Sequence, residues 1–192
     1  MEVFVHKGYT DATIPEIAKS SDLAVGTLYI YYPNKRELFI SVIENLMIVP
    51  IADVFAKKAN EEFPTIMKNA LENRMGFLQG NTLNQLSALM SEILRDPELR
   101  DMYAEKLIKP FISHMENIYR SRVASGEFRK LKPEIIVRLI DSMMIGMSLL
   151  RNIEGESSPL NLMSQEKLED EIMNFILFGL MNRNREFKQE MR

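Results

Sequence analysis

The stretch GYTDATIPEIAKSSDLAVGTLYIYYPNKRELF, from Gly8 to Phe39, holds the strongest structural signal in the chain. It places Thr13 and Glu16 at the spacing of a capping box, in which each side chain can bond the backbone N–H of the other. Pro15 then falls in the first helical turn, where its missing N–H is not needed. The polar run Ser20 to Asp22 breaks the helical pattern, so the sequence predicts a short first helix.

A second short helix is predicted from about Ala24 to Tyr31, with Leu28 turned inward. Pro33 ends it, because proline disfavours helical geometry in the residue before it. The run Asn34 to Glu37 repeats the capping pattern and opens a longer helix. Two short helices joined by a tight turn predict a helix-turn-helix, whose second helix enters the DNA major groove.

At these positions the chain resembles the TetR family of bacterial and archaeal transcriptional regulators. The resemblance rests on residues that occur in order and without a gap: Gly8-Tyr9, Thr13, Ile17-Ala18, Gly26-Thr27-Leu28-Tyr29, Tyr32, Lys35 and Leu38. It implies a DNA-binding head followed by a helical domain for ligand binding and dimerisation. The rest of the chain varies with the ligand in this family, so the resemblance does not imply which ligand is bound.

The resemblance also implies which residues contact DNA phosphates, namely Thr13, Tyr29 and Lys35. Lys35 lies near the start of a helix, a position that favours anions. Outside such a motif, a solvated surface charge is the ordinary role of a lysine. Core packing is the alternative for Tyr29 and the favoured interpretation for Tyr32, because buried aromatic rings dominate small cores.

The second helix is implied to face the bases. Gly26 would let the backbone approach the DNA, and Thr27 and Tyr31 would reach base edges or nearby phosphates. Val25 and Ile30 could contact only thymine methyl groups, because apolar side chains cannot read hydrogen-bond donors or acceptors. The predicted DNA-binding set is therefore Thr13, Val25, Gly26, Thr27, Tyr29, Tyr31 and Lys35.

Three features depart from the family pattern. The chain begins at Met1, in what would be the last turns of the first helix, so about 10 residues of a helix of average length are expected to be missing. Asp22 stands where the family usually has glycine, and Ala24 stands where a serine usually caps the second helix. Alanine is a poor cap, at a cost of about 1 kcal/mol.

The predicted head is acidic. Between Met1 and Met47, four lysine or arginine residues stand against six acidic residues, a net charge of −2. Non-specific DNA affinity comes mainly from cations that meet phosphates. Binding therefore requires either a preceding basic segment or a dimer that makes specific contacts.

Composition limits the class of protein. The chain has 192 residues, of which 46% are hydrophobic and 27% charged, as in globular proteins with a substantial core. It has no cysteine, which excludes disulfides, thiolate metal sites and cysteine nucleophiles. The sequence shows neither a signal peptide nor an apolar run near the ~20 residues that span a bilayer, so a cytoplasmic location is expected.

The remaining residues predict helices throughout, so the expected fold class is all-α. A helix from Glu37 to about Ala59 contains Pro50, which predicts either a bend around the core or a hinge between ligand and DNA. Further helices are predicted at 64–80, 82–94, 96–125 with a kink at Pro110, from 133 onward, and at 165–181, with a loop at 154–162. The expected domains are a helix-turn-helix head at 1–46, with its first helix shortened, and a ligand-binding and dimerisation domain at 47–192.

The last predicted helix is apolar on nearly every side from Ile172 to Met181, so nearly every side needs cover. A second subunit is the expected cover, because two C-terminal helices pair with those of a partner in the TetR family. Gly146 and Gly179 fit places where two helices approach closely. A homodimer would present two heads to a palindromic site.

A ligand cavity is expected among the later helices. Seven apolar side chains could line it, although each taken alone fits ordinary core packing better: Phe55, Met67, Met90, Phe111, Met115, Met143 and Met147. The 14 methionines favour a site that accepts varied shapes. His6 and His114 are far apart in sequence, and no metal-ligand, phosphate-loop or dinucleotide motif is present, so no metal, cofactor or catalytic residue is expected.

Together, the residues and the resemblance predict a TetR-type transcriptional repressor. It would bind a palindromic double-stranded DNA operator as a homodimer and be released by a small, largely apolar effector. The alternative is a helical small-molecule binding or sequestering dimer whose head no longer reads DNA, which the acidic head and Ala24 motivate. An enzyme has no support from any motif.

Overall fold

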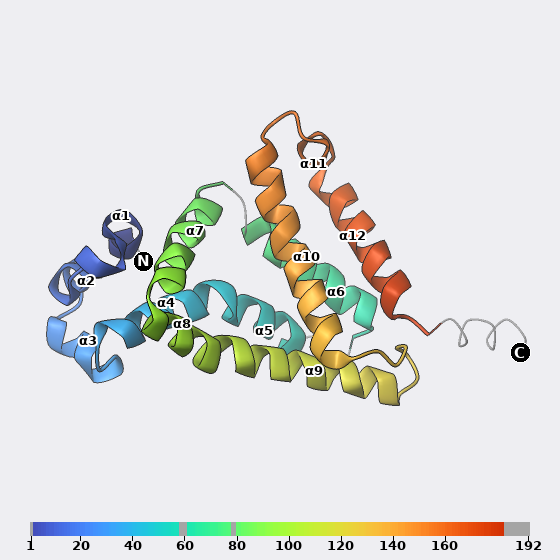
Figure 1. Cartoon of the computed structure of the whole chain (residues 1–192), viewed down its shortest axis with the longest axis horizontal. Coiled ribbons are helices and arrows are strands. Elements are labelled where there is room, and N and C mark those ends of the chain that lie inside the picture. The colour runs from blue at the N-terminus through green and yellow to red at the C-terminus, as the bar shows by residue number, and fades with distance from the viewer. Residues whose placement is uncertain (1, 58–60, 78–79, 183–192) are drawn as a thin grey trace, which may run out of the picture. The chain divides into compact units, whose positions relative to one another are not determined.

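The computed structural model describes residues 2–57, 61–77 and 80–182, and the described part is built from helices (Figure 1). In chain order these are α1 (Glu2–Asp11), α2 (Ile14–Ser20), α3 (Val25–Tyr31), α4 (Lys35–Met47), α5 (Val49–Lys57), α6 (Phe63–Phe77), α7 (Gly80–Arg95), α8 (Pro97–Tyr103), a π-helical turn (Ala104–Ile108), α9 (Lys109–Ala124), α10 (Pro133–Glu154), α11 (Pro159–Leu162) and α12 (Gln165–Leu180). The predicted all-α class is confirmed.

By packing, the chain divides into two compact units. The first unit comprises residues 1–52 and 80–109, and the second comprises residues 53–79 and 110–192. The predicted domain boundary between residues 46 and 47 falls inside α4. As a boundary between the DNA-binding and ligand-binding regions, it stays a prediction. The units differ from it because α7 and α8, distant in sequence, pack with the N-terminal helices.

An aromatic cluster forms the core of the first unit where α1 meets α4. The ring of Phe39 lies 5.1 Å from that of Phe4 and 5.0 Å from that of Tyr9, in both cases edge to face. The backbone of α1 is kinked at Gly8, which has a φ of +77°. This left-handed conformation favours glycine; a Cβ there would also lie 2.9 Å from Glu92 Oε1 of α7, which is the end of a flexible side chain and can move aside.

The bend that Pro50 predicts is present, since α4 and Val49–Phe55 meet at 44°, but the two segments are separate helices and not one kinked helix. The helix breaks at Ile48, and Pro50 occupies the first turn of α5, where its missing N–H leaves no gap in the bonding. Among the described residues no single helix is long and apolar enough to cross a membrane; α4 with Val49–Phe55 meets that test only as a bent pair.

The predicted helix from Asp96 to Ser125 is confirmed at both ends and altered in the middle. Asp96 caps α8 by accepting from the N–H groups of Glu98 and Leu99, at 2.9 and 3.2 Å. Gly126, with a φ of +78°, ends α9. Instead of a simple kink at Pro110, a π-helical turn spans the preceding residues, because the proline ring crowds the carbonyl four residues earlier.

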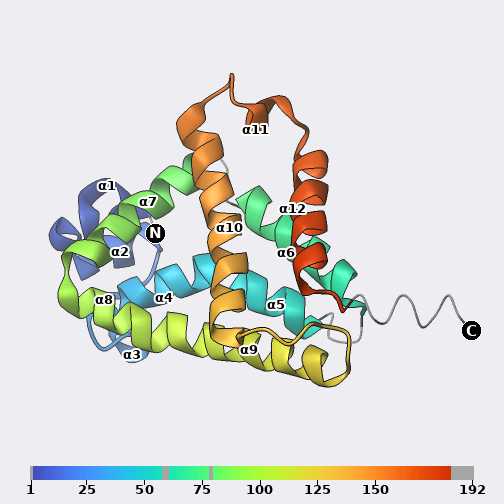
Figure 2. The ribbon, with the colours of Figure 1, turned by 45° about the vertical axis from the view of Figure 1, so that its right-hand side comes forward.

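In the second unit, α6 packs against both α10 and α12. The latter two run in opposite directions and are joined through α11 (Figure 2). That short helix lies in the segment 154–162, which the sequence predicts as a loop. Ser158 caps it by accepting from the N–H of Leu160, and Pro159 takes its first position, so local signals for a helical turn were present.

Candidate nucleic-acid interface

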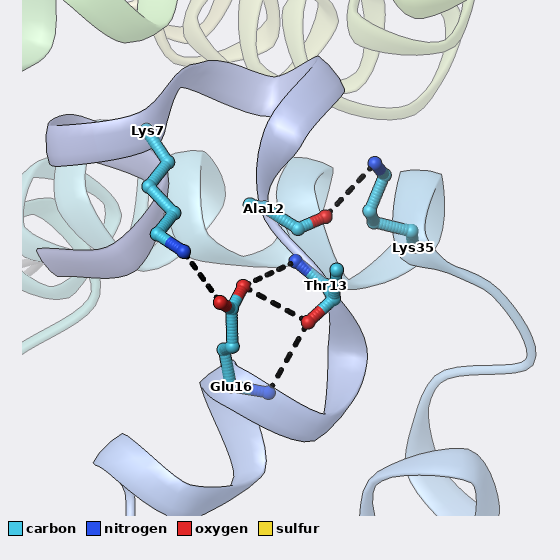
Figure 3. Close-up of polar contacts among 5 residues, drawn as sticks. All are labelled: Lys7, Ala12, Thr13, Glu16 and Lys35. Atoms are coloured by element: carbon cyan, nitrogen blue, oxygen red, sulfur yellow. Dashed lines mark hydrogen bonds and ion pairs between the residues drawn. The ribbon is translucent and has the colours of Figure 1, made fainter.

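The predicted capping box opens α2 (Figure 3). The N–H of Glu16 donates to Thr13 Oγ1 at 3.4 Å, and the N–H of Thr13 donates to Glu16 Oε2 at 3.2 Å. The Thr13 hydroxyl donates to the same carboxylate oxygen at 2.9 Å, while Lys7 Nζ bonds the other oxygen. The predicted contact of Thr13 with phosphate stays a prediction. In this structure, its side chain is bonded to Glu16 and caps α2.

The same bonds make this contact sensitive to acid. The Lys7 ammonium, and after it the Thr13 hydroxyl and N–H, hold the pKa of Glu16 below its usual range. A carboxyl whose pKa is lower in the folded state stabilises the fold above its unfolded-state pKa, and loses this effect as pH falls through the folded-state pKa.

We therefore expect Glu16→Gln to lower the melting temperature near neutral pH. On acidification, the melting temperature of the variant should fall by less than that of the parent. Glutamine can still bond the N–H of Thr13, so the variant removes the charge and keeps the cap. Thermal melts from neutral to acidic pH test this, with the exposed Glu44→Gln as control. Equal acid sensitivity in Glu16→Gln and the parent would contradict it.

The turn after α2 explains why the family prefers glycine at position 22. The N–H of Leu23 donates to the carbonyl of Ala18 at 2.9 Å, and that of Asp22 to Lys19 at 3.3 Å, the bonds of a Schellman motif. This motif puts Asp22 at a φ of +54°, a conformation that glycine adopts without strain and aspartate tolerates.

Asp22→Ala is expected to lower the free energy of unfolding by about 1 kcal/mol, because alanine resists this left-handed conformation. Asp22→Gly should be at least as stable as the parent, since it removes that strain. Chemical denaturation of the three proteins measures the order. Alanine and glycine variants of equal stability would show that the backbone at position 22 is not strained.

Helix α3 exposes most of its side chains. Its N-cap residue, Ala24, makes no side-chain bond, as the sequence predicts. Leu28 is buried and fixes the inner face, whereas Ile30 and Tyr31 are 78% and 73% exposed. Tyr29 and Val25 are also exposed, and Thr27 is half-buried. The predicted base-facing residues thus lie on an accessible surface.

Tyr32 takes the structural role that the sequence favours. It is half-buried after the end of α3, and its hydroxyl accepts from Ser41 Oγ at 3.4 Å. This contact ties the end of α3 to α4.

The structure shows a bonded position for Lys35 that the sequence did not predict. Its ammonium donates to the carbonyl oxygen of Ala12 at 3.0 Å (Figure 3). It also donates to the carbonyl oxygen of Thr10 at 3.0 Å and lies 4.6 Å from the centre of the Tyr9 ring. Two of its three N–H hydrogens therefore hold the link between α1 and α2. The phosphate contact of Lys35 stays a prediction.

Other cations of the head also have internal partners. Arg36 on α4 pairs with Glu98 on α8 at 2.6 Å. The neighbouring Glu37 accepts from Lys106 in the π-helical turn at 2.5 and 2.6 Å. Lys7 is bound to Glu16, as described above. These cations bond protein carboxylates in this structure. The head therefore offers even less positive charge to DNA phosphates than its net charge suggests.

The candidate effector residues divide between the units. Met67, Phe111 and Met115 are buried in the second unit, where Phe55, Met143 and Met147 are half-buried. Met90, on α7, belongs to the first unit. Both histidines are exposed, and the described residues contain no group of three potential metal ligands.

Sequence reasoning missed the buried arginine of the second unit. Arg74 on α6 is 3% exposed, and its Nη2 donates to Asp141 Oδ1 on α10 at 3.1 Å. The partners are 67 residues apart, and an arginine on an amphipathic helix usually faces solvent, so no local signal marks the pair.

Helices α10 and α12 each expose large apolar side chains. They are Ile135, Leu139, Leu149, Leu150 and Ile153 on α10, and Phe175 and Phe178 on α12. A Cβ on Gly146 or Gly179 would meet no atom within 4 Å, so within the described chain neither glycine serves a close contact. The buried side of α12 instead packs through Ile172, Ile176 and Leu180.

Comparisons with known proteins agree with this geometry. Residues 1–42 match the model of the bacterial regulatory proteins of the tetR family. The fatty acid metabolism regulator protein of Bacillus subtilis is 26% identical over 151 residues, covering 76% of this chain and 74% of that protein. The uncharacterized HTH-type transcriptional regulator YvdT of Bacillus subtilis is 24% identical over 164 residues, covering 80% and 83%.

Solved structures share the fold. FadR from Bacillus subtilis, in complex with stearoyl-CoA, matches with a TM-score of 0.68 at 20% identity, over 93% of this chain and 94% of that one. FadR from Bacillus halodurans matches with a TM-score of 0.67 at 18% identity, over the same shares. The chain belongs to the TetR family of transcriptional regulators. It combines the helix-turn-helix of that family with further helices in the rest of the chain.

Proposed function

We propose that this chain is a cytoplasmic repressor that binds a palindromic operator as a homodimer and leaves it when an amphipathic effector binds. The observation that carries the proposal is the exposed face of α3, held by a complete capping box and a Schellman turn in a segment that matches the family model. The DNA contacts are assigned to Thr13, Val25, Gly26, Thr27, Tyr29, Tyr31 and Lys35.

Dimerisation is assigned to α10 and α12. Seven large apolar side chains on these helices are exposed, and an apolar patch rimmed by polar residues marks an interaction site. The open space beside Gly146 and Gly179 suits the close approach of partner helices. A two-fold dimer would bring two copies of α3 to the two half-sites of a palindrome.

The effector is assigned to the long-chain acyl-CoA class. This assignment is supported by the relatives named fatty acid metabolism regulator and FadR, one of which is in complex with stearoyl-CoA. In this chain, the flexible apolar side chains of Met67, Met115, Met143 and Met147 suit an acyl chain. The effector can shift the protein from DNA only by the difference between its affinities for the two states.

An operator selected from random duplexes provides the test. Stearoyl-CoA should release the full-length chain from the fluorescent operator duplex, whereas free coenzyme A should not, because it lacks the acyl chain. Size-exclusion chromatography with light scattering should give twice the chain mass. If neither compound releases the chain from DNA, the effector assignment is wrong. If a single chain binds the operator as a monomer, the dimer assignment is wrong.

A sequestering dimer with an inactive head is the second candidate. The observation that favours it is the internal pairing of Lys7, Lys35 and Arg36 within an acidic head. A sequestering dimer should bind acyl-CoA but should enrich no duplex in the selection from random DNA. A repressor should do both, so the same experiment separates the two functions.

A further inference from the structure

The stretch LAVGTLYIYYP, from Leu23 to Pro33, contains all of α3 and has neither a charged nor an amide side chain. Its only polar side-chain atoms are the hydroxyl oxygens of Thr27, Tyr29, Tyr31 and Tyr32. The Tyr32 hydroxyl is bonded to Ser41 on α4. The DNA-facing helix therefore offers apolar surface and three hydroxyl groups.

The most exposed point of α3 is apolar. Ile30 lies one helical turn after Gly26, on the side of the helix opposite the buried Leu28. A Cβ on Gly26 would meet nothing within 4 Å, so the surface beside Ile30 is open. Val25, Tyr29 and Tyr31 on the same helix are also exposed.

This surface lacks the side chains that distinguish most bases. Guanine is read by two bonds from arginine or lysine, and adenine by two bonds from asparagine or glutamine. The nearest amide, Asn34, uses its Oδ1 to cap α4 by accepting from the N–H of Glu37 at 2.9 Å, so it cannot bond adenine in that way while it caps. Lys35 and Arg36 are directed at protein groups.

One group in the major groove suits such a surface, the C5 methyl of thymine. We propose that this head selects its half-site by the positions of thymine methyl groups that pack against Ile30 and Val25. The inference rests on the proposed function, because it specifies what the DNA-facing helix reads. It predicts an operator whose essential positions are A·T pairs recognised through the methyl and not through the hydrogen-bonding edge.

Uracil replacement tests this directly, because deoxyuridine lacks only the methyl and keeps the base pair. With an operator selected from random duplexes, thymines are replaced one at a time and affinity is measured by fluorescence anisotropy with the full chain. At contacted positions we expect about a fourfold loss per methyl, the effect of burying one such group. Replacing a contacted thymine by 5-methylcytosine, paired with guanine, should bind more tightly than cytosine.

A paired substitution assigns the contact to the protein. Ile30→Ala should weaken binding to the thymine duplex by about tenfold, and much less to a duplex with uracil at the contacted position. Leu94→Ala, which changes a side chain that is 70% exposed on α7, should leave both affinities unchanged. Because Ile30 is also exposed, its removal does not disturb the core.

The outcomes separate the inference from the proposed function. An enriched operator that tolerates uracil at every position, or equal losses for Ile30→Ala on both duplexes, overturns methyl recognition and leaves DNA binding intact. A selection that enriches no duplex overturns the DNA-binding proposal and this inference with it. Uracil sensitivity that disappears in Ile30→Ala supports both.

Discussion

Phe39→Ala is expected to unfold the DNA-binding head, because Phe39 is 0% exposed at the centre of its aromatic cluster. Removing a buried phenylalanine costs about 3–5 kcal/mol through lost burial and the cavity left behind. The edge-to-face contacts with Phe4 and Tyr9 add to this loss. A loss of this size is a large fraction of the total stability of a domain.

Chemical denaturation followed by circular dichroism measures the change. Phe39→Leu serves as the matched control, since it keeps an apolar side chain at the same position and should cost about 1.5 kcal/mol or less. An alanine variant within about 1 kcal/mol of the parent would contradict a core centred on Phe39.

Lys35→Met is expected to lower the free energy of unfolding by about 2 kcal/mol. A hydrogen bond from a charged group contributes about 1.5–3 kcal/mol, and the partial exposure of Lys35 reduces the sum of its two bonds. Methionine keeps the length of the side chain and removes the ammonium. Lys19→Met is the control, because Lys19 is exposed on α2 and should contribute little to stability.

The same variant distinguishes the two roles of Lys35. If the ammonium binds only Thr10 and Ala12, the slope of log K against log salt for operator binding should not change. If it neutralises a phosphate, the slope should fall by about 1 while stability stays near that of the parent. Unchanged stability in Lys35→Met would contradict the structural role.

Local chemistry made much of the fold predictable. The Thr13 and Glu16 capping box, the Asp96 cap, Gly126 and Pro133 each mark a helix end found in the structure. These signals act over a few residues, so a single sequence contains them. The break at Ile48 and the π-helical turn before Pro110 were missed, because proline indicates a disturbance and neighbouring contacts decide its form.

Contacts between distant residues were not predictable. Lys35 bonds carbonyl groups 23 and 25 residues earlier, and Lys106 bonds Glu37 across 69 residues. The sequence motif therefore predicts a phosphate contact for Lys35 and contains no sign of its internal partners. The same limit applies to the effector residues, since Met90 shares a helical pattern with the others but lies in the first unit.

We propose above all that α3 reads a specific DNA sequence. The most direct measurement is fluorescence anisotropy of the full chain on its selected palindrome and on a scrambled duplex of the same composition, at two salt concentrations. We predict tighter binding to the palindrome, weakened by salt, and a marked loss for Tyr31→Ala on the palindrome alone. Equal affinity for both duplexes, or a Tyr31→Ala variant that binds like the parent, would contradict the claim.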